Sequence, residues 1–271
     1  MTRIPENTAL ITGASSGIGA IAADRLADRG HDLILVARNR ERLEELATHL
    51  QSETGRSVEV VEADLNDPTD RSQVEHVLRT NESITALVNN AGIGAPTAFL
   101  DANVARLEGM IDLNVTALVR LTYAALPGFL KRGGGTIINI ASVLGIVPEL
   151  YSGVYGASKA FVIAFSRSLH KEFSEKNIRI QVVLPGATAT GFLGIAGIQP
   201  REVPSESVMN ADEMVGAALA GFDHGEFITI PSLPDIADWE AYETARQNLI
   251  PKLSLKKPAP RYGVTVETSP R

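Results

Sequence analysis

The chain has 271 residues, of which 44% are hydrophobic and 21% charged, which suits one large α/β domain or two small ones. It contains no cysteine, so disulfides, thiolate metal sites and cysteine nucleophiles are excluded. The net charge of −7 and the lack of a basic block interleaved with aromatic residues argue against nucleic acid as a partner.

Short apolar runs alternate with longer amphipathic runs, and this alternation predicts strands followed by helices. In chain order, the expected strands are Thr8–Thr12, Asp32–Ala37, Val58–Glu62, Ala86–Asn89, Thr136–Ile140, Ile178–Leu184 and Glu226–Ile230. The expected helices are Gly17–Arg29, Arg40–Glu53, Pro68–Arg79, Asn103–Lys131, Ser152–Lys176 and Ala211–Phe222. Nearly continuous apolar strands separated by helices are typical of parallel strands covered on both faces. The sequence therefore predicts an α/β fold with a doubly wound, parallel, seven-stranded sheet of the Rossmann type.

No long polar linker or solenoid repeat divides the chain, so residues 1–255 are expected to form a single domain. Residues 256–271 are expected to be an irregular tail because they are rich in proline. Residues 188–207 combine glycine and proline with four large apolar side chains, which suits a substrate lid better than a solvated loop. Those side chains are Phe192, Leu193, Ile195 and Ile198.

Metal ions and membranes are not expected partners. The five histidines are scattered, and none lies four residues from another beside an acid, so we predict no metal site. The apolar runs are broken by Gly, Asp or Arg, and none approaches the roughly 20 residues that span a bilayer. With the first strand at Thr8 and no cysteine, we expect a cytoplasmic protein.

A glycine-rich turn at 12–19 follows the first strand and opens the first helix. Glycines at this place allow a tight turn and a close approach of backbone amides to a pyrophosphate at the helix N-terminus. The spacing is Gly-x3-Gly-x-Gly instead of the usual Gly-x-Gly-x-x-Gly. We expect the cofactor to contact the residues of this turn, namely Gly13, Ser15, Ser16, Gly17, Ile18 and Gly19.

The same turn also matches the Gly-x-Ser-x-Gly nucleophile elbow of α/β-hydrolases at residues 13–17. A hydrolase would need an acid and a later histidine, and His224 is a candidate. Ser15, however, follows the first strand, whereas the hydrolase elbow follows a strand deep in the sheet. Gly19 has no function in a hydrolase elbow, so dinucleotide binding is the favoured interpretation.

The ribose-selecting residue of a dinucleotide fold lies about 20 positions past the fingerprint, which here gives Ala37-Arg38. No Asp or Glu is present to bind a ribose 2′-hydroxyl. The Arg38 guanidinium instead offers a fork of donors suited to a phosphate. The sequence therefore favours NADP over NAD, although Arg38 could also be a solvated residue at the start of a charged helix.

Tyr155 and Lys159 are four residues apart near the start of an expected helix, so their side chains lie on one face. A neighbouring ammonium favours the phenolate and lowers the pKa of a tyrosine from about 10, which makes it a usable general acid or base. The small residues between them, Gly156-Ala157-Ser158, indicate that another segment packs closely there.

Together these motifs resemble those of the short-chain dehydrogenase/reductase family, and the likeness runs from Thr8 to about Ile230. Seven motifs occur in the family's order, namely Thr-Gly-x3-Gly-x-Gly at 12–19, Asp64, Asn89-Asn90-Ala91-Gly92, Asn114, Ser142, Tyr155-x3-Lys159 and Pro185-Gly186. One such motif would be weak, but seven in register are specific.

The resemblance implies that Tyr155 donates or accepts the proton, while Lys159 lowers its pKa and holds the nicotinamide ribose. It implies that Ser142 binds the substrate oxygen and that Asn114 holds a water relaying protons from Lys159. The remaining cofactor contacts implied by the family are Asp64, Leu65, Asn90, Ala91, Gly92, Pro185, Gly186, Thr188 and Thr190. Many NADP-preferring relatives carry Arg or Lys where this chain has Ser16, so the 2′-phosphate would rest on Arg38, helped by Ser15 or Arg40.

The expected activity is hydride transfer between NADP(H) and a carbonyl or alcohol. The substrate is expected to be apolar because Gly94, Leu144, Val147, Leu150 and Tyr151 are the expected walls, with Ser142, Leu144 and Tyr151 as binding residues. Alternatives are a nucleotide-binding sensor or scaffold without turnover, and an epimerase or dehydratase on the same fold. By family habit, the helices at 103–131 and 152–176 would form the interface of a homodimer or homotetramer.

Overall fold

The computed structural model describes residues 7–94, 99–150, 153–195 and 204–264, except the side chains of Leu193 and Ile195. Contacts group the chain into two compact units, Met1–Ser232 and Leu233–Arg271. This boundary lies before the one expected between residues 255 and 256, and the single-domain assignment stays a prediction. The first unit holds every predicted site residue.

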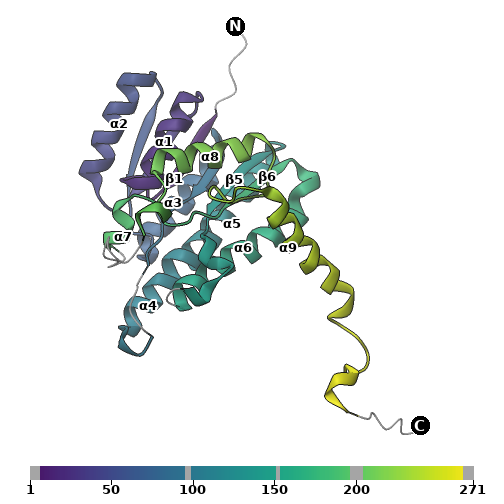
Figure 1. Cartoon of the computed structure of the whole chain (residues 1–271). Helices are drawn as coiled ribbons and strands as arrows, with labels where there is room; N and C mark the ends of the chain where they lie inside the picture. The colour runs from purple at the N-terminus through teal and green to yellow at the C-terminus, as the bar shows by residue number, and fades with distance from the viewer. Residues whose placement is uncertain (1–6, 95–98, 151–152, 196–203, 265–271) are drawn as a thin grey trace. The chain divides into compact units, whose positions relative to one another are not determined.

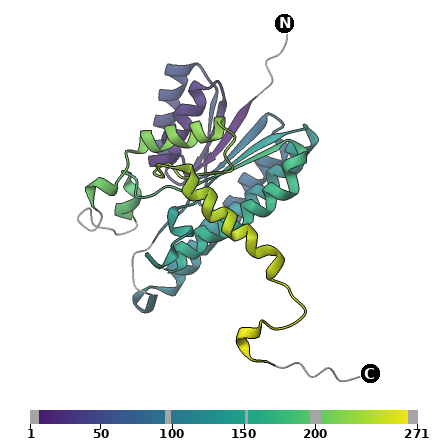
Figure 2. The same cartoon turned by 45° about the vertical axis from the view of Figure 1, so that its right-hand side comes forward.

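The first unit is built on a seven-stranded parallel sheet with the order β3-β2-β1-β4-β5-β6-β7 (Figures 1 and 2). The strands are β1 (Thr8–Thr12), β2 (Asp32–Ala37), β3 (Val58–Glu62), β4 (Ile84–Asn89), β5 (Gly135–Ile140), β6 (Ile178–Val183) and β7 (Ile228–Thr229). The predicted doubly wound α/β fold is confirmed. The last strand has two residues instead of the expected five, because only Ile228 and Thr229 pair with β6.

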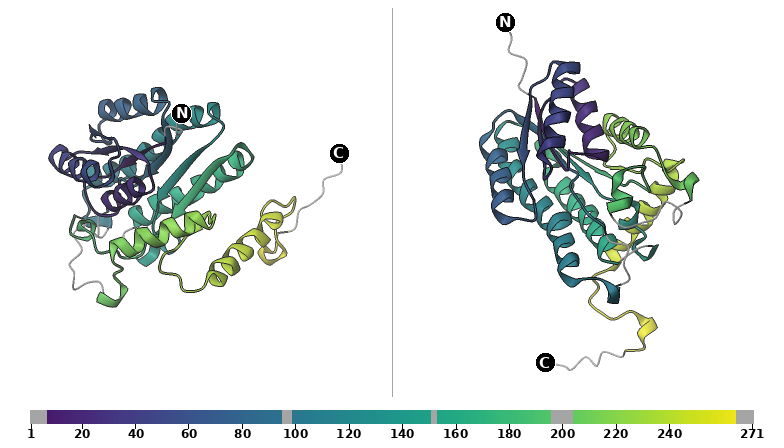
Figure 3. Two further views of the ribbon diagram at one scale, coloured as in Figure 1. Left: turned by 90° about the horizontal axis from the view of Figure 1, so that it is seen from above. Right: turned by 90° about the vertical axis from the view of Figure 1, so that its left-hand side faces the viewer.

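Helices cover both faces of the sheet (Figure 3). On one face lie α1 (Gly17–Asp28), α2 (Arg40–Thr54) and α8 (Ala211–Asp223), and on the other lie α3 (Pro68–Thr80), α5 (Leu118–Lys131) and α6 (Gly153–Phe173). Successive strand side chains point to opposite faces, so Ala9 and Ile11 of β1 pack with the first group and Leu10 with the second. This two-sided burial explains why the strands read as continuous apolar runs.

The helix expected over 103–131 forms as three joined segments, α4 (Val104–Ile111), a π-helical segment (Asp112–Ala117) and α5. Within the described residues, Val104–Lys131 is the one helix long and apolar enough by length and composition to cross a membrane, in contrast to the expectation from the apolar runs. Half of its most apolar window is buried inside the protein. The π segment places Asn114, one of the predicted catalytic residues, at an irregular turn.

The second unit contains α9 (Ile236–Leu249), which the sequence patterning did not predict, and short 3₁₀ turns at Ile250–Lys252 and Pro260–Tyr262. Asp235 caps α9 by accepting a hydrogen bond from the Ala237 amide at 2.9 Å. Every residue of α9 is described, and none is buried. Its apolar side chains do not gather on one buried face, which is why helical periodicity failed to reveal it.

Candidate active site

The turn after β1 needs glycine at two positions for different reasons. Gly13 adopts φ 67°, a left-handed conformation that other residues rarely take. A Cβ at Gly19 would lie 2.3 Å from the Gly13 carbonyl oxygen, so no side chain fits there. Beyond this turn, Ser16 precedes α1 and is exposed, but it makes no side-chain capping bond, unlike Asn39 at the start of α2. The first amides of α1 therefore remain available to an anion.

Thr12 fastens this turn to the segment after β4. Its Oγ1 accepts hydrogen bonds from the amides of Asn90 at 3.0 Å and Ala91 at 3.1 Å. In return, Asn90 Nδ2 donates to the carbonyls of Thr12 at 2.9 Å and Gly13 at 3.2 Å. Two predicted cofactor segments thus lie side by side. Sequence reasoning placed Thr12 in the motif but did not predict this bracing function.

Arg38 follows β2 and is well exposed, with Nη1 3.9 Å from Asp64 Oδ2. The neighbouring Arg40 is already engaged, because its Nε donates to Glu44 at 2.7 Å. Of the two arginines considered for a phosphate, Arg38 is therefore the less committed. Asp64 is itself oriented by accepting a hydrogen bond from the Asn66 amide at 3.0 Å.

Leu65, next to Asp64, is buried, and its carbonyl accepts a hydrogen bond from the buried Arg71 at 3.0 Å. Arg71 belongs to α3 and was not predicted, because a charged residue in an amphipathic helix reads as solvated. The bond fixes the backbone of the segment after β3. We infer that this segment is held rigid where the adenine contacts were expected.

Lys159 lies in the interior of the protein. Its Nζ donates to the Ile140 carbonyl at 2.9 Å, at the end of β5, and lies 5.8 Å from the centroid of the Tyr155 ring. Burial lowers the pKa of Lys159 from 10.5 to about 8, because the charged form loses its hydration. A Cβ at Gly92 would approach this Nζ to 3.4 Å, so the segment after β4 also borders the lysine.

Asn114 connects three segments through its side chain. Its Oδ1 accepts from the Ile93 amide at 2.9 Å, and its Nδ2 donates to the Ile93 carbonyl at 3.0 Å and to Ser158 Oγ at 3.0 Å. The Ser158 hydroxyl donates to the Tyr155 carbonyl at 2.7 Å. Asn114 thereby braces the turn of α6 that carries Tyr155 and Lys159. Because both Nδ2 hydrogens are committed, a water held by Asn114 would have to donate to one of its oxygens, Oδ1 or the backbone carbonyl.

Ser142 follows β5 and is buried against the segment after β6. Its Oγ donates to the Pro185 carbonyl over a long 3.4 Å and accepts from the Leu144 amide at 3.2 Å. The following turns then pass directly over α6. A Cβ at Gly156 would lie 2.7 Å from Pro148 Cβ, and one at Gly145 would lie 2.9 Å from the Lys159 carbonyl carbon. The first contact explains why glycine follows Tyr155, and the second shows how closely the turn packs on the backbone of Lys159.

Tyr155 is buried in an apolar cluster with Leu107 and Met110. Partly buried apolar side chains pack against this cluster, among them Ile93, Leu144 and Phe192. Of the other expected substrate walls, Leu150 is largely exposed. Tyr151 and residues 196–203 of the expected lid lie outside the described residues, so their proposed contacts stay predictions.

The segment after β6 reaches back to the glycine-rich turn. Thr188 Oγ1 donates to the Gly186 carbonyl at 3.1 Å, and a Cβ at Gly17 would lie 3.2 Å from the Cβ of Thr190. The expected cofactor residues from the ends of β1, β4, β5 and β6 are therefore gathered at the carboxyl edge of the sheet. In open α/β sheets this edge is where ligands bind.

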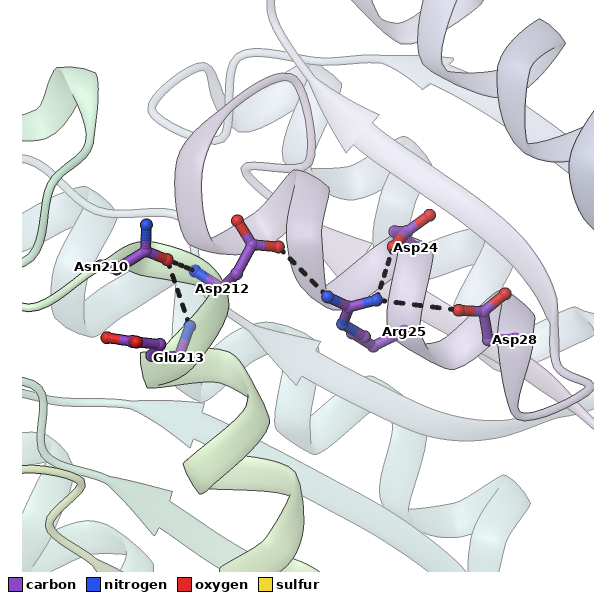
Figure 4. Close-up of polar contacts among 6 residues, drawn as sticks. All are labelled: Asp24, Arg25, Asp28, Asn210, Asp212 and Glu213. Carbon is purple, nitrogen blue, oxygen red and sulfur yellow. Dashed lines mark hydrogen bonds and ion pairs between the residues drawn. The ribbon is translucent and has the colours of Figure 1, made fainter.

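The chain segments that enter and leave the expected lid lie side by side. Thr188 pairs with Met209, and the Ala189 amide donates to the Met209 carbonyl at 2.8 Å. Asn210 then caps α8 by accepting from the amides of Asp212 and Glu213 (Figure 4). Asp212 in turn forms an ion pair of 3.3 Å with Arg25 of α1 (Figure 4). The segment that follows the lid is thus attached to α1, the helix that follows the glycine-rich turn.

Beneath the site, four buried polar side chains connect the central strands with α5 and α6. Asn89 Nδ2 donates to Thr122 Oγ1 at 3.2 Å and to Asn139 Oδ1 at 2.9 Å, and Asn139 Nδ2 donates to Ser166 Oγ at 2.9 Å. Of these residues, only Asn89 belonged to a predicted motif. Partners this distant in sequence cannot be identified from spacing alone.

Comparison with known proteins identifies the family of the chain. The family model described as short chain dehydrogenase matches residues 7–196. This chain belongs to the short-chain dehydrogenase/reductase family. As a member of it, the chain is an oxidoreductase acting on CH–OH and carbonyl groups.

Two solved structures are similar to this short-chain dehydrogenase/reductase over nearly its whole length. A short-chain dehydrogenase from Sphingobium yanoikuyae in complex with NADPH is 47% identical, with a TM-score of 0.91, covering 94% of this chain and 100% of that one. The bulky-bulky ketone specific alcohol dehydrogenase from Comamonas testosteroni is 43% identical, with a TM-score of 0.87, covering 96% and 99%. Sulfoacetaldehyde reductase 2 from Chromohalobacter salexigens is 40% identical over 185 residues, which are 68% of this chain and 73% of that protein.

Proposed function

We propose that this protein is an NADP(H)-dependent carbonyl reductase, or alcohol dehydrogenase in the reverse direction, with Tyr155 as the proton donor or acceptor. The observation that carries the proposal is the bracing of Tyr155 and Lys159 by Asn114 and Ser158 beside the end of β5. Bound nicotinamide would supply or accept the hydride. The protein's own residues would bind and orient the cofactor and the substrate, and Tyr155 would transfer the proton.

The residues at the carboxyl edge fit a dinucleotide. The uncapped start of α1 leaves backbone amides for a diphosphate, and the glycines at 13 and 19 allow the turn to pack closely on itself and on the segment after β4. Arg38 would hold the 2′-phosphate, with Asp64 and Leu65 beside the adenine. Asn90 to Gly92, Pro185, Gly186, Thr188 and Thr190 would line the remainder. The NADPH bound to the Sphingobium yanoikuyae relative supports this choice of cofactor.

The chemistry we assign to the site needs a tyrosine that changes protonation near neutral pH. The Lys159 ammonium near the Tyr155 ring stabilises a phenolate. Ser142 would bind the substrate oxygen, and its long contact with Pro185 can be exchanged for that oxygen without losing a strong bond. A water held by Asn114 would relay protons from Lys159.

The substrate we propose is an apolar ketone or aldehyde. Apolar side chains packed with Tyr155 include Leu107, Met110, Ile93, Leu144 and Phe192, none of which can hydrogen-bond a sugar or phosphate. The name of the Comamonas testosteroni relative, which is 43% identical, points to ketones with large substituents.

The assembly we propose is a homodimer or homotetramer in the cytoplasm. Large apolar side chains are exposed on the two helices expected at the interface, with Tyr123 and Leu130 on α5 and Phe161 on α6. Burying such residues against a second copy is the usual basis of a symmetric interface.

A spectrophotometric screen of ketones and aldehydes with NADPH and NADH in parallel tests the function. We expect NADPH oxidation with the native protein, and we expect Tyr155→Phe to lower kcat by at least about a thousandfold while NADPH binding stays measurable. Ser142→Ala is a second variant, which removes the proposed contact with the substrate oxygen and leaves the sequence of α6 unchanged. Near-normal turnover by Tyr155→Phe would contradict the mechanism. Absence of turnover across the panel would favour a sensor or scaffold instead.

A further inference from the structure

A phenylalanine lies directly against the proposed catalytic tyrosine. The ring centroids of Phe192 and Tyr155 are 5.9 Å apart, and the ring planes are tilted by 45°. Phe192 belongs to α7 (Gly191–Ile195), a five-residue helix within the expected lid. Aromatic pairs at this separation attract each other beyond the effect of buried area.

Phe192 attaches α7 to the body of the unit. Among the described residues, Cβ atoms built at Gly191 and Gly194 meet no atom within 4 Å. Phe192 in contrast packs on the cluster around Tyr155, and its amide donates to Thr190 Oγ1 at 3.2 Å.

Thr190 connects this contact to the glycine-rich turn. The side chain that accepts from the Phe192 amide also lies against Gly17, at the start of α1. The ring against Tyr155 and the proposed diphosphate site are joined through one threonine.

We propose that Phe192 is a specificity-determining residue that selects ketones carrying an aryl or equally bulky apolar group. This inference rests on the proposed function and names the substrate class of the same site. A carbonyl whose oxygen is bound to the Tyr155 hydroxyl places a substituent close to the phenol ring. Phe192 supplies the apolar surface for that substituent, while small ketones leave this surface unused.

The test compares acetophenone with acetone as substrates for Phe192→Ala and Phe192→Leu. We expect the ratio of kcat/KM for acetophenone to that for acetone to fall at least tenfold in Phe192→Ala, mainly through KM, and less in Phe192→Leu. Phe222→Leu is the matched control, because that ring lies in α8 against Arg179, away from Tyr155. An unchanged ratio in Phe192→Ala would overturn the proposal.

A second measurement separates this inference from the proposed reaction. Acetophenone binding to the NADPH complex is measured by calorimetry in the Tyr155→Phe background, with and without Phe192→Ala. We expect the second substitution to weaken binding at least fivefold. If the native protein lacks turnover and binding still weakens, the reaction is wrong and the assignment of Phe192 stands. If turnover occurs while the ratio of kcat/KM values and the binding of acetophenone stay unchanged, the assignment of Phe192 is wrong. It is also wrong if acetophenone does not bind.

Discussion

Arg38 is the residue on which the proposed cofactor preference depends. Its guanidinium is exposed and only weakly paired with Asp64, so a phosphate can compete for it. Charge-assisted hydrogen bonds to one group are worth about 1.5–3 kcal/mol, or roughly 10- to 100-fold in affinity.

We therefore expect Arg38→Ala to raise KM for NADPH by about 10- to 100-fold and to change KM for NADH less than threefold. Initial rates with both cofactors measure the difference. Arg42→Ala, which removes another exposed arginine of α2, is the control. Equal effects of Arg38→Ala on the two cofactors would show that Arg38 is a solvated helix residue.

Lys159 makes the stability of the cofactor-free protein depend on pH. Its pKa is about 8 in the folded protein and near 10.4 in the unfolded chain. Between these values the unfolded chain binds more protons, so the free energy of unfolding rises with pH across this window. Below pH 8 the buried charge costs about 3 kcal/mol, taking about 1.4 kcal/mol per pKa unit.

Replacing the charge should therefore stabilise the protein while abolishing activity. Lys159→Met removes this cost but leaves the Ile140 carbonyl without its donor, which costs about 1 kcal/mol. We expect a net gain of about 2 kcal/mol at pH 7 that disappears between pH 8 and 10.5, measured by urea unfolding. The exposed Lys171→Met in the same helix is the control. A loss of stability independent of pH would contradict the lowered pKa of Lys159.

At the scale of elements, periodicity predicts best where a strand or helix has one consistent environment. The buried strands β1 and β2 lie where the apolar runs indicate, because both faces of the sheet are covered. Periodicity does not reveal the π segment, since the residues around Asn114 continue the apolar pattern of a straight helix. It also overlooks α9, none of whose residues is buried.

The residues of the candidate site likewise divide into those that the sequence pattern predicts and those that it does not. Motif spacing identified the residues after each strand, and the structure brings Asn90, Asn114 and Lys159 around Gly92. The supporting partners could not be predicted from local pattern, because Thr12, Asn139 and Ser166 act across 27 to 79 residues of chain. Their hydrogen bonds depend on which strands become neighbours, and that is a property of topology.

At the scale of the whole molecule, the exposed apolar side chains of α5 and α6 predict self-association. Tyr123 is 76% exposed and Phe161 41% exposed, and Phe161 stacks on Phe165 at 5.9 Å. A stable interface buries about 1,200–2,000 Å² with an apolar centre, which these helices can supply.

We expect sedimentation velocity to show dimers or tetramers at micromolar concentration, and Phe161→Glu to shift them at least tenfold toward monomer. A charge buried at the centre of an interface without a partner is costly, which gives the direction. Glu172→Lys, an exposed change on the same helix, controls for altered surface charge. A native protein that sediments as a monomer would contradict the proposed assembly.

The pairing of Thr188 with Met209 has an evolutionary consequence. Because the two ends of the intervening segment are held together by the scaffold, its length and composition can drift with little entropic cost to folding. Relatives can thus acquire new substrates by exchanging this segment alone, while the residues proposed to bind the cofactor stay unchanged. A transplanted loop joined at these two residues is the natural starting point for redesigning selectivity.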